Sequence, residues 1–438
     1  MASLPPHSST GDARRRLARQ AWKAQGLLSS KPFGRGIEAT RRALEHLGYI
    51  QIDTLSVVAR AHHHSLWNRV PNYRPQHLDH LLENGNIFEY WYHAASYLPM
   101  RDYRYALPRM QAFRDGSVAW ARSRDKKLMR RVLKRIQEEG PLQARDFEDI
   151  RTGKSGWWDW KPTKRALEQL FMQGDLMISG RNGFQKIYDL RERVLPSHID
   201  RSTPSIEEYA AYLIDTSLRA HSVTPRTAFS YGRRGMPLRR AIDAILAQRV
   251  AEVSLIRVNL EKDLRPTQAG SPMKSKPKQL EMFTEPDTLN GKLPRVPHRM
   301  RVLSPFDNAV ILRDRNLALH GFDYQLECYL PEAKRRFGYF CLPLLYGDTL
   351  IGRMDCKAHR SAKPAPWLEV KHLHLEHPLP RESSEKTFVE AFQSALLNFA
   401  EFNACERVGI SNISTDALRS SWGRAAVKKL TRRLHALF

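Results

Sequence analysis

The stretch GYIQIDTLSVVARAHHHSLWNRV, residues 48–70, decides the fold around it because it opens with a short apolar strand that carries two isolated polar residues. These residues are Gln51 and Asp53. Neighbouring side chains on a strand point to opposite faces, so Gln51 and Asp53 share one face while Ile50 and Ile52 share the other. The pattern predicts that the apolar pair enters a core and that the polar pair borders a cleft.

The residues on either side set the limits of this strand. Gly48 is typical of the residue that ends a helix, here the helix expected at 37–47. After the strand, Asp53 or Thr54 is well suited to cap a helix expected to begin near Leu55. The pattern alone therefore leaves two roles open for Asp53, a catalytic carboxylate in a cleft and a helix cap.

Basic residues dominate the charge of the chain. Lys and Arg total 71, Asp and Glu total 46, and the formal net charge is +25. A field of that sign attracts polyanions, and nucleic acid is the leading partner. A membrane surface is the competing polyanion, but the longest apolar run, near 340–346, is far shorter than the ~20 residues that cross a bilayer. We expect no membrane-spanning segment, and a peripheral basic helix stays an alternative.

The first 11 residues, MASLPPHSSTG, are polar and lack the apolar centre of a secretory signal. We expect a disordered tip followed by an amphipathic helix that carries Arg14, Arg15 and Arg16. An organellar transit peptide, which is also rich in Arg and Ser, is the alternative. The sequence favours a cytoplasmic protein, associated with the nucleoid in a bacterium.

Cysteine and histidine spacing gives no support for a metal site or another cofactor. The four cysteines form no CxxC pair, so neither a zinc ribbon nor a disulfide framework is expected. His62, His63 and His64 are consecutive, and successive helical residues point about 100° apart, so the three cannot share one ion. A solvated helix face and a histidine pair contacting phosphate are the preferred interpretations.

Helix and strand patterns predict an α+β protein with three tandem winged-helix domains followed by a small β-barrel. In the clearest unit, helices expected at 125–140, 141–150 and 162–176 precede two strands joined at Asn182-Gly183, a pair typical of hairpins. The expected divisions are a disordered N-terminus at 1–11, winged helices at 12–120, 121–200 and 201–260, a linker at 261–298, and a barrel with a terminal helix and basic tail at 299–438.

Candidate DNA contacts lie where a third helix or a wing carries cations. In the second unit these are Lys164, Arg165, Arg181 and Lys186, and in the third Arg233, Arg234, Arg239 and Arg240. Solvated surface charge is the alternative for each of them. The aromatic segment at 87–99, IFEYWYHAASYLP, offers surfaces on which an unpaired base could stack, with a place in the core as its alternative.

Four segments carry a resemblance to a known family. They are QIDTLSVVARAHHHSLWNRVPNYRPQHL at 51–78, IFEYWYHAASYLPMRDYRYALPRM at 87–110, LSPFDN at 303–308 and YLPEAKRRFGYFCLPLLYGDTLIGRMD at 329–355. The chain resembles the YcaQ-type (AlkX-like) crosslink-repair DNA glycosylases, winged-helix relatives of AlkZ, over about 12–400. The resemblance does not extend to the stretch 261–294.

The resemblance implies a basic channel for duplex DNA, excision of N7-alkylated guanine and unhooking of interstrand crosslinks. The family's Gln-aliphatic-Asp catalytic motif is matched by Gln51, Ile52 and Asp53. The AlkZ branch has Gln in place of this Asp, so the chain is similar to the less substrate-restricted YcaQ branch. Five residues within the first matching block are expected to contact DNA, namely Arg60, His62, His63, Trp67 and Arg69. A monomer acting on double-stranded DNA is expected.

This chemistry suits the residue types. An N7-alkylguanine already carries positive charge, so its departure needs no strong acid and leaves an oxocarbenium-like sugar. A carboxylate such as Asp53 can stabilise that cation and accept a proton from water, while the Gln51 amide holds the water. A winged-helix transcriptional regulator without catalysis is the alternative, and it leaves the pair of Gln51 and Asp53 unexplained.

Strand cleavage is not expected. Glycosylases that cut the backbone attack the sugar with an amine, and the interval between Lys31 and Lys126 contains no lysine. Arginine stays protonated and cannot take that role. The sequence thus predicts a monofunctional enzyme, unless a lysine from another part of the chain reaches the site.

Overall fold

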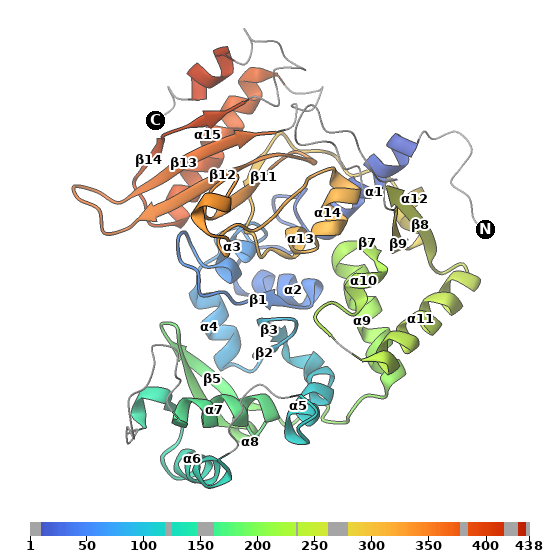
Figure 1. Cartoon of the computed structure of the whole chain (residues 1–438), viewed down its shortest axis with the longest axis vertical. Helices are drawn as coiled ribbons and strands as arrows, with labels where there is room; N and C mark the ends of the chain where they lie inside the picture. Colours follow the sequence, from blue (N-terminus) through green and yellow to red (C-terminus); the bar gives the residue numbers. More distant parts are fainter. Residues whose placement is uncertain are drawn as a thin grey trace.

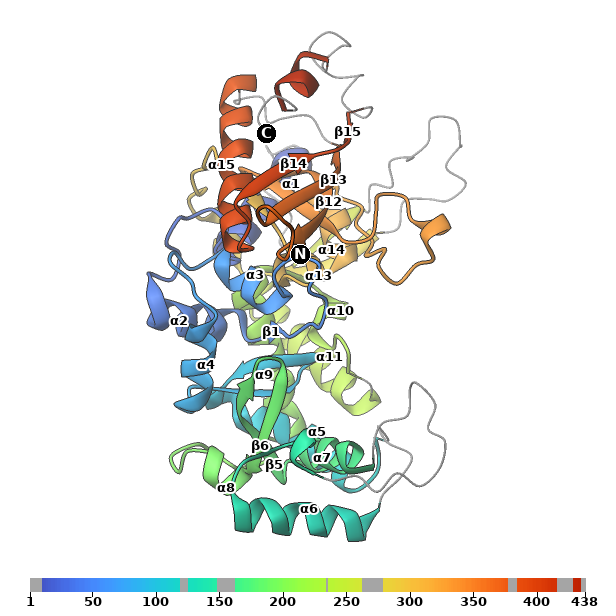
Figure 2. The same cartoon turned by 90° about the vertical axis from the view of Figure 1, so that its left-hand side faces the viewer.

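The computed structural model describes residues 10–118, 125–147, 162–233, 235–261, 279–376, 384–415 and 428–434. They form a mixed α+β protein with three three-stranded sheets and one six-stranded sheet. Figures 1 and 2 show an elongated arrangement, with the six-stranded sheet at one end and helix α6 at the other. The first sheet, which contains Gln51, lies between these ends.

The first sheet is small and is surrounded by short helices. Its strands β1 (Ile50–Gln51), β3 (Ala95–Pro99) and β2 (Ile87–Trp91) are antiparallel and lie in that order. Around it are α2 (Gly36–Leu47), α3 (Ala61–Trp67), α4 (Gln76–Glu83), the 3-10 helix η1 (Met100–Ala106) and α5 (Leu107–Arg114). Gly48 ends α2 at φ 78, as the sequence predicts, and its N–H donates to the Leu44 carbonyl.

The predicted continuation of this stretch differs from the structure in one respect. The strand ends at Gln51, and no helix begins near Leu55, because α3 starts only at Ala61. The residues between them pair with distant segments instead, for example through the Ala358 N–H, which donates to the Val57 carbonyl over 2.9 Å. The prediction that Asp53 or Thr54 caps a helix is therefore wrong.

The second sheet has the order β4-β6-β5 and contains the predicted hairpin. Its elements are α6 (Lys126–Glu139), β4 (Leu142–Gln143), η2 (Ala144–Asp146), α7 (Pro162–Gln173), β5 (Leu176–Asn182), β6 (Gln185–Leu190) and α8 (Arg191–Val194). The turn at Gly183 has φ 59, which a glycine adopts without strain. Where a helix was expected at 141–150, the described part is a short strand and one 3-10 turn. The Trp-rich connection at 157–160 lies outside the described residues.

The third sheet has the order β7-β9-β8 and corrects the predicted linker. Its unit contains α9 (Ile206–His221), β7 (Val223–Pro225), α10 (Arg226–Phe229), α11 (Met236–Ala251), β8 (Ile256–Glu261), β9 (Gln279–Thr284) and α12 (Pro286–Asn290). Both β9 and α12 fall inside the segment expected to be a linker. Strand β9 pairs with β7 and with β8, and these distant partners are invisible to a local pattern. The rest of that segment, 262–278, lies outside the described residues.

The C-terminal part is an open mixed sheet covered by a helix, in place of the predicted barrel. Strands β10 (Met300–Val302), β11 (Cys341–Tyr346), β12 (Thr349–His359), β13 (Trp367–Leu375) and β14 (Arg407–Ile410) follow in that order, and β15 (Ile413–Ser414) also pairs with β13. Within the described residues no pairing joins β10 to β14, which closure would require. The other elements are α13 (Asn308–Ile311), α14 (Arg313–His320), η3 (Glu332–Lys334) and α15 (Glu385–Phe402).

Phe388, Phe392, Leu396 and Phe399 repeat at helical spacing along α15, and all four are buried against this sheet. Residues 428–434, within the expected basic tail, are helical. Two of them, Leu430 and Leu434, are buried in the same cluster. Part of the tail therefore belongs to the packed structure.

The first helix, α1 (Thr10–Ala24), lies near the N-terminus and packs on elements of the C-terminal part. It begins two residues inside the expected disordered tip, and residues 1–9 lie outside the described part. Its Trp22 is fully buried and donates from Nε1 to the Asp348 carbonyl over 2.9 Å. The Arg14 side chain donates to the Leu319 carbonyl. This helix packs on the C-terminal part, although the sequence places it with the first unit.

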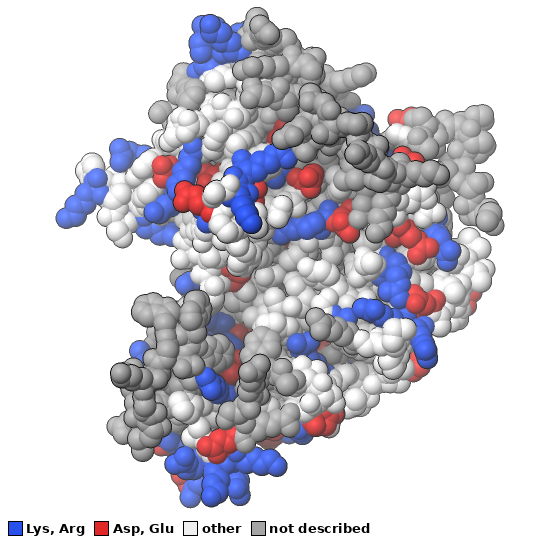
Figure 3. Space-filling model, viewed as in Figure 1, with Lys and Arg blue, Asp and Glu red and all other residues white. Residues whose placement is uncertain are grey.

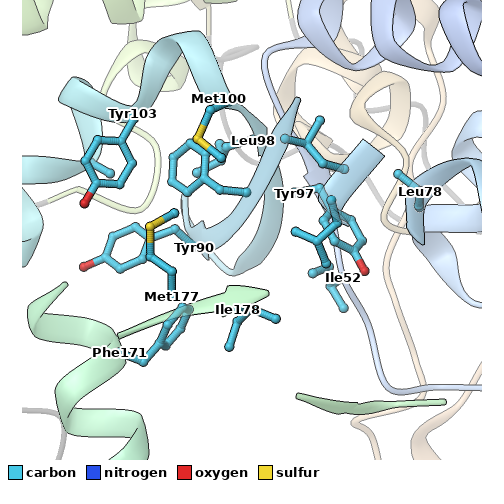
Figure 4. Packing of buried hydrophobic residues seen from close by; sticks show 14 of the residues in the cluster. Ile52, Leu78, Tyr90, Tyr97, Leu98, Met100, Tyr103, Phe171, Met177 and Ile178 are labelled. Carbon is cyan, nitrogen blue, oxygen red and sulfur yellow. The ribbon is translucent and has the colours of Figure 1, made fainter. Parts of the chain in front are cut away.

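One hydrophobic cluster contains residues of both the first and the second sheet, and strand β1, which carries Gln51, packs against it. Figure 4 shows Ile52 and Tyr97 of the first unit in the same cluster as Phe171 and Ile178 of the second. Ile50 belongs to this cluster as well, so the predicted core placement of Ile50 and Ile52 is confirmed. The short strand β1 is thus held by packing on both sides of Gln51.

Candidate active site

Gln51 lies at the end of β1, opposite Ser96 of β3. The residue is 8% exposed, and its Oε1 lies 2.9 Å from Nε2 of His93. His93 is at the tip of the β2–β3 hairpin, where the Tyr92 N–H donates to the Ala94 carbonyl. Within the described residues the Gln51 amide nitrogen has no hydrogen-bond acceptor. One end of the amide is therefore held and the other is left for a ligand.

Asp53 is half-buried and begins a turn. Its Oδ1 accepts from the Leu55 N–H over 2.7 Å. Burial raises the pKa of the Asp53 carboxyl, and the Leu55 N–H offsets this only in part. No cationic side chain of the described residues forms an ion pair with Asp53. In a chain with a net charge of +25, a half-buried carboxylate without a cation is an unusual arrangement.

A loop of the C-terminal part approaches Asp53. Burial raises the pKa of both Cys328 and Tyr329, and the negative charge of Asp53 raises them further. Tyr329 is 72% exposed. Behind it, the Glu327 carboxylate accepts from the backbone N–H groups of Arg336, Phe337 and Gly338, so the loop has a fixed shape. An exposed aromatic ring is thereby presented beside the candidate carboxylate.

Two arginines, Arg60 and Arg360, lie close to the chain that follows Asp53. Burial lowers the pKa of Arg60, and the nearby charges of Arg181 and Arg360 lower it further. The Arg60 Nε atom is buried and has no hydrogen-bond partner among the described residues. Arg360 donates to the Ser56 carbonyl, 304 residues earlier in the chain, and to the Asn403 carbonyl. Arg60 was expected to contact DNA, whereas Arg360 was missed, because it lies far from the motif in the sequence and no local pattern marks it.

The histidine run is buried. His62 and His64 are 4% and 0% exposed, which contradicts the predicted solvated face. Burial lowers the pKa of His63 to about 4 and that of His64 to about 4. The His63 ring bonds the Tyr73 hydroxyl over 2.8 Å, and the His64 ring bonds the Val302 carbonyl. His62 and His63 stay neighbours, with ring centroids 4.2 Å apart, but we no longer expect them to contact phosphate as cations.

Arg69 and Trp67 both make contacts within the fold, and Arg69 is buried away from any ligand. Arg69 is 1% exposed, and its guanidinium forms a bidentate ion pair with the buried Asp307 at 2.7 and 2.8 Å. It also donates to Gln25. Trp67 is half-buried and stacks on Phe402 with centroids 4.8 Å apart. The prediction that Arg69 binds DNA is therefore corrected, and that for Trp67 stays a prediction.

The wing cations of the second unit are also paired internally. Arg181 donates to the buried Glu89 over 2.6 Å, and Lys186 lies 3.1 Å from Glu168 and 3.4 Å from Glu89. These carboxylates neutralise both cations, so we withdraw Arg181 and Lys186 as phosphate contacts. On α7, Lys164 is exposed and Arg165 is half-buried. Both remain candidates from the sequence.

Among the third-unit candidates, Arg239 and Arg240 are exposed, and Arg234 lies outside the described residues. Arg233 packs over the Tyr92 ring at 4.1 Å and donates to the Tyr209 hydroxyl, so its charge lies among aromatic rings. Arg239 lines an open cavity of about 690 Å³ between α10 and α11. Figure 3 shows Lys and Arg over these helices and on both sides of the hollow between the upper and lower parts of the molecule.

The aromatic segment at 87–99 is mostly core. Tyr90 and Tyr97 are buried, whereas Trp91 and Tyr92 line a cavity of about 650 Å³ together with residues of α5 and α9. The Tyr92 ring stacks on Tyr49 with centroids 4.3 Å apart. Most of this segment therefore has the structural role that the sequence left as its alternative, and His93 is the member whose side chain contacts that of Gln51.

A strongly basic α+β chain in which the described residues leave one half-buried carboxylate without a cation has the features of an enzyme that acts on nucleic acid. The profile of the family described as DNA glycosylase AlkZ-like matches residues 44–402, and the chain belongs to this family of DNA glycosylases. The solved structure of Streptomyces sahachiroi DNA glycosylase AlkZ is similar, with a TM-score of 0.55 and 14% identity over 91% of this chain and 98% of that chain. At that identity the likeness concerns the fold. Among the described helices, none is both long and apolar enough to cross a membrane.

Proposed function

We propose that this DNA glycosylase hydrolyses the N-glycosidic bond of N7-alkylated guanine in duplex DNA and unhooks interstrand crosslinks at such bases. The observation that carries the proposal is Asp53, a half-buried carboxylate with a raised pKa and no cation among its described neighbours. A structural carboxylate in this position would be expected to have a cationic or multiple N–H partner. An oxocarbenium-like sugar supplies the missing positive charge at the moment of reaction.

Asp53 and Gln51 divide the work in this proposal. The alkylated base leaves with the electrons of the glycosidic bond, so positive charge develops on the sugar beside Asp53. Asp53 stabilises that charge and accepts a proton from the attacking water, while Gln51 holds the water oxygen. Protonation of the leaving base is not needed, because N7 alkylation already makes it a cation.

We propose that Arg60 and Arg360 hold the DNA backbone next to the lesion. Burial lowers the pKa of Arg60, the charges of Arg181 and Arg360 lower it further, and the Arg60 Nε atom lacks a partner among the described residues. A phosphate oxygen between them would relieve the repulsion and satisfy that donor. We further propose that the three three-stranded sheets, with their helices, are winged-helix units that contact the duplex on both sides of this point.

The direct test is base release. Purified protein is incubated with duplex DNA carrying one 7-methylguanine, and abasic sites are revealed by heat or alkali. A second substrate with a nitrogen-mustard-type crosslink between two N7 atoms reports unhooking on a denaturing gel. Release from both substrates supports the proposal, and release from neither would contradict the substrate class. Unmodified duplex is the control.

The proposed reaction is monofunctional. No lysine occurs between Lys31 and Lys126. Lys186, a lysine on the wing of the second unit, is paired with Glu168 and Glu89. Borohydride should trap no covalent protein–DNA adduct during base release. A trapped adduct would show that an amine from another segment attacks the sugar. The regulator alternative has no observation in its favour in a chain of this family.

A further inference from the structure

We propose that His93 is a positioning residue for the reaction: its Nε2–H donates to Oε1 of Gln51 and thereby turns the amide nitrogen of Gln51 toward the attacking water. The inference rests on the proposed function and adds to it a residue from outside the Gln-Ile-Asp motif. The observation that carries it is the 2.9 Å contact between the two side chains. It also explains why the amide nitrogen has no acceptor among the described residues.

The direction of this hydrogen bond follows from the surroundings of the ring. A neutral imidazole has one N–H, on either Nδ1 or Nε2. The Nδ1 atom of His93 is buried without a partner among the described residues. A proton on Nδ1 would leave a buried donor unsatisfied, whereas a proton on Nε2 meets Oε1 of Gln51. Burial also lowers the pKa of His93 to about 3, so the ring is neutral in the working range.

The orientation of the amide decides how the water is held. An N–H of the amide donates to the water oxygen, so both hydrogens of the water stay available and one of them can bond Asp53. The opposite orientation would present a carbonyl oxygen, which would accept a water hydrogen and compete with Asp53 for it. An amide fixed by His93 therefore supports Asp53 as the only base, and the remaining lone pair of the water points to the sugar carbon.

The third unit holds His93 in place. The His93 ring lies against Tyr231 of the third unit and edge-on to Tyr49 of the first unit, with centroids 5.0 Å apart in both cases. Next to it, a Cβ on Gly232 would lie 2.5 Å from the His93 Cβ. Only a glycine fits there, because the backbone of the loop after α10 touches the histidine directly. The hairpin tip of the first unit is thus positioned by the third unit, about 140 residues further along the chain.

A double-mutant cycle tests the inference. His93→Phe keeps a flat ring but removes the donor, and we expect the single-turnover rate of 7-methylguanine release to fall by about 10-fold to 10²-fold, the range for losing the alignment of a reacting group. His93→Gln can place an N–H near the same point and should recover most of the rate. In a Gln51→Ala background, His93→Phe should cause no further loss, because its effect passes through Gln51.

Affinity for the DNA should not change in these variants. A wild-type rate for His93→Phe, or an equal loss with and without Gln51, would overturn the inference. Wild-type rates for both Gln51→Ala and Asp53→Asn would instead overturn the proposed function itself. The two failures are therefore distinguishable.

Gly232→Ala provides a second route to the same test. It forces His93 away without changing any polar group, so base release should fall as in His93→Phe. Gly183→Ala is the matched control, since this glycine also has a positive φ, at 59, but a Cβ added there would meet nothing within 4 Å. A loss of rate in the control equal to that in Gly232→Ala would assign the effect to backbone strain and contradict the positioning role.

Discussion

Two aspartates of this protein accept a hydrogen bond from the N–H two residues ahead, Asp53 in a turn and Asp307 at the start of α13, and they differ in burial and in charge compensation. Asp53 accepts from the N–H two residues ahead at 2.7 Å, and Asp307 does so at 2.9 Å. Asp307 is fully buried and also receives both arms of Arg69. Burial alone would raise the pKa of Asp307, but the Arg69 charge brings it below its ordinary value, whereas the pKa of Asp53 is raised. Within the described part of the chain, one carboxylate is neutralised by an arginine and the other is not.

This difference has opposite consequences for stability and for reaction. A lowered pKa means that the charged form of Asp307 stabilises the fold above its ordinary pKa and that this is lost as the pH falls through the folded value. A raised pKa means that the charged form of Asp53 costs stability at neutral pH. The free-energy cost of burying a charged carboxylate remains at Asp53, whereas Arg69 offsets it at Asp307. Uncompensated charge of this kind is typical of functional sites.

The largest effect should come from breaking the compensated pair. Arg69→Ala leaves Asp307 buried without a cation, and removal of one partner from a buried pair costs about 3–5 kcal/mol. We expect the free energy of unfolding in urea to fall by that amount, or the protein to be recovered unfolded. Arg41→Ala, which removes a partly exposed ion pair along one helix, is the control and should change this free energy by less than about 1 kcal/mol. A small loss for Arg69→Ala would contradict the role given to the pair.

Asp53→Asn should have the opposite effects to Arg69→Ala, a large loss of activity without a loss of stability. Loss of the base and of the negative charge should lower the rate of 7-methylguanine release by about 10²-fold or more. Because the charge costs stability, the melting temperature should stay the same or rise. Single-turnover assays and thermal unfolding on one preparation check both halves. Full activity would remove Asp53 from the mechanism, and a fall in melting temperature would mean that its turn is structurally necessary.

The pH dependence should separate the two aspartates further. The raised pKa of Asp53 means that its basic form is lost as the pH falls, beginning above the ordinary value of 3.8. Base release should drop about tenfold per pH unit below that pKa, since only the ionised fraction acts as base. The residual rate of Asp53→Asn should lack this limb. A limb of the same shape in the variant would assign the titration to another group.

The smallest expected effect concerns DNA binding. Each phosphate contact contributes about 0.9 to the slope of log affinity against log salt. Arg60→Gln and Arg360→Gln should therefore each lower that slope by about 0.9 on undamaged duplex, with little preference for sequence. Arg41→Gln removes the same charge from a site already paired with two carboxylates and should leave the slope unchanged. Equal slopes in all three variants would place the backbone contacts elsewhere.

Local patterns were sufficient where the physics is local. Alternation placed Ile50 and Ile52 in the core, and the Asn182-Gly183 turn forms the predicted hairpin. The same stretch marked Gln51 and Asp53 as an isolated polar pair. Their catalytic role remains a prediction, since an uncompensated carboxylate is a reason for expecting chemistry and not a measurement of it.

Long-range pairing explains what the sequence could not predict. The carboxylates that neutralise Arg69 and Arg181 are 238 and 92 residues away. The sequence shows both cations but not these distant partners, and it therefore predicts that both arginines contact DNA. The residues of β9 have the local pattern of a linker, because they form a strand only through pairing with β7 and β8. His93 and Arg360 were missed for a related reason, since only the folded chain brings them to the motif.

The docking of α1 on the C-terminal part has a consequence for how the protein is made. Arg14 bonds a carbonyl 305 residues away, and α3, next to the candidate site, is tied through Arg69 and Asn68 to residues that lie 238 and 234 positions later. Contacts between residues so far apart in the sequence form late in folding, because closing such long loops costs chain entropy before the contacts can stabilise the fold. During synthesis the motif therefore emerges long before its supports do. A nascent or truncated chain should carry the Gln-Ile-Asp sequence without an assembled site, so that hydrolytic activity arises only once nearly the whole polypeptide has left the ribosome.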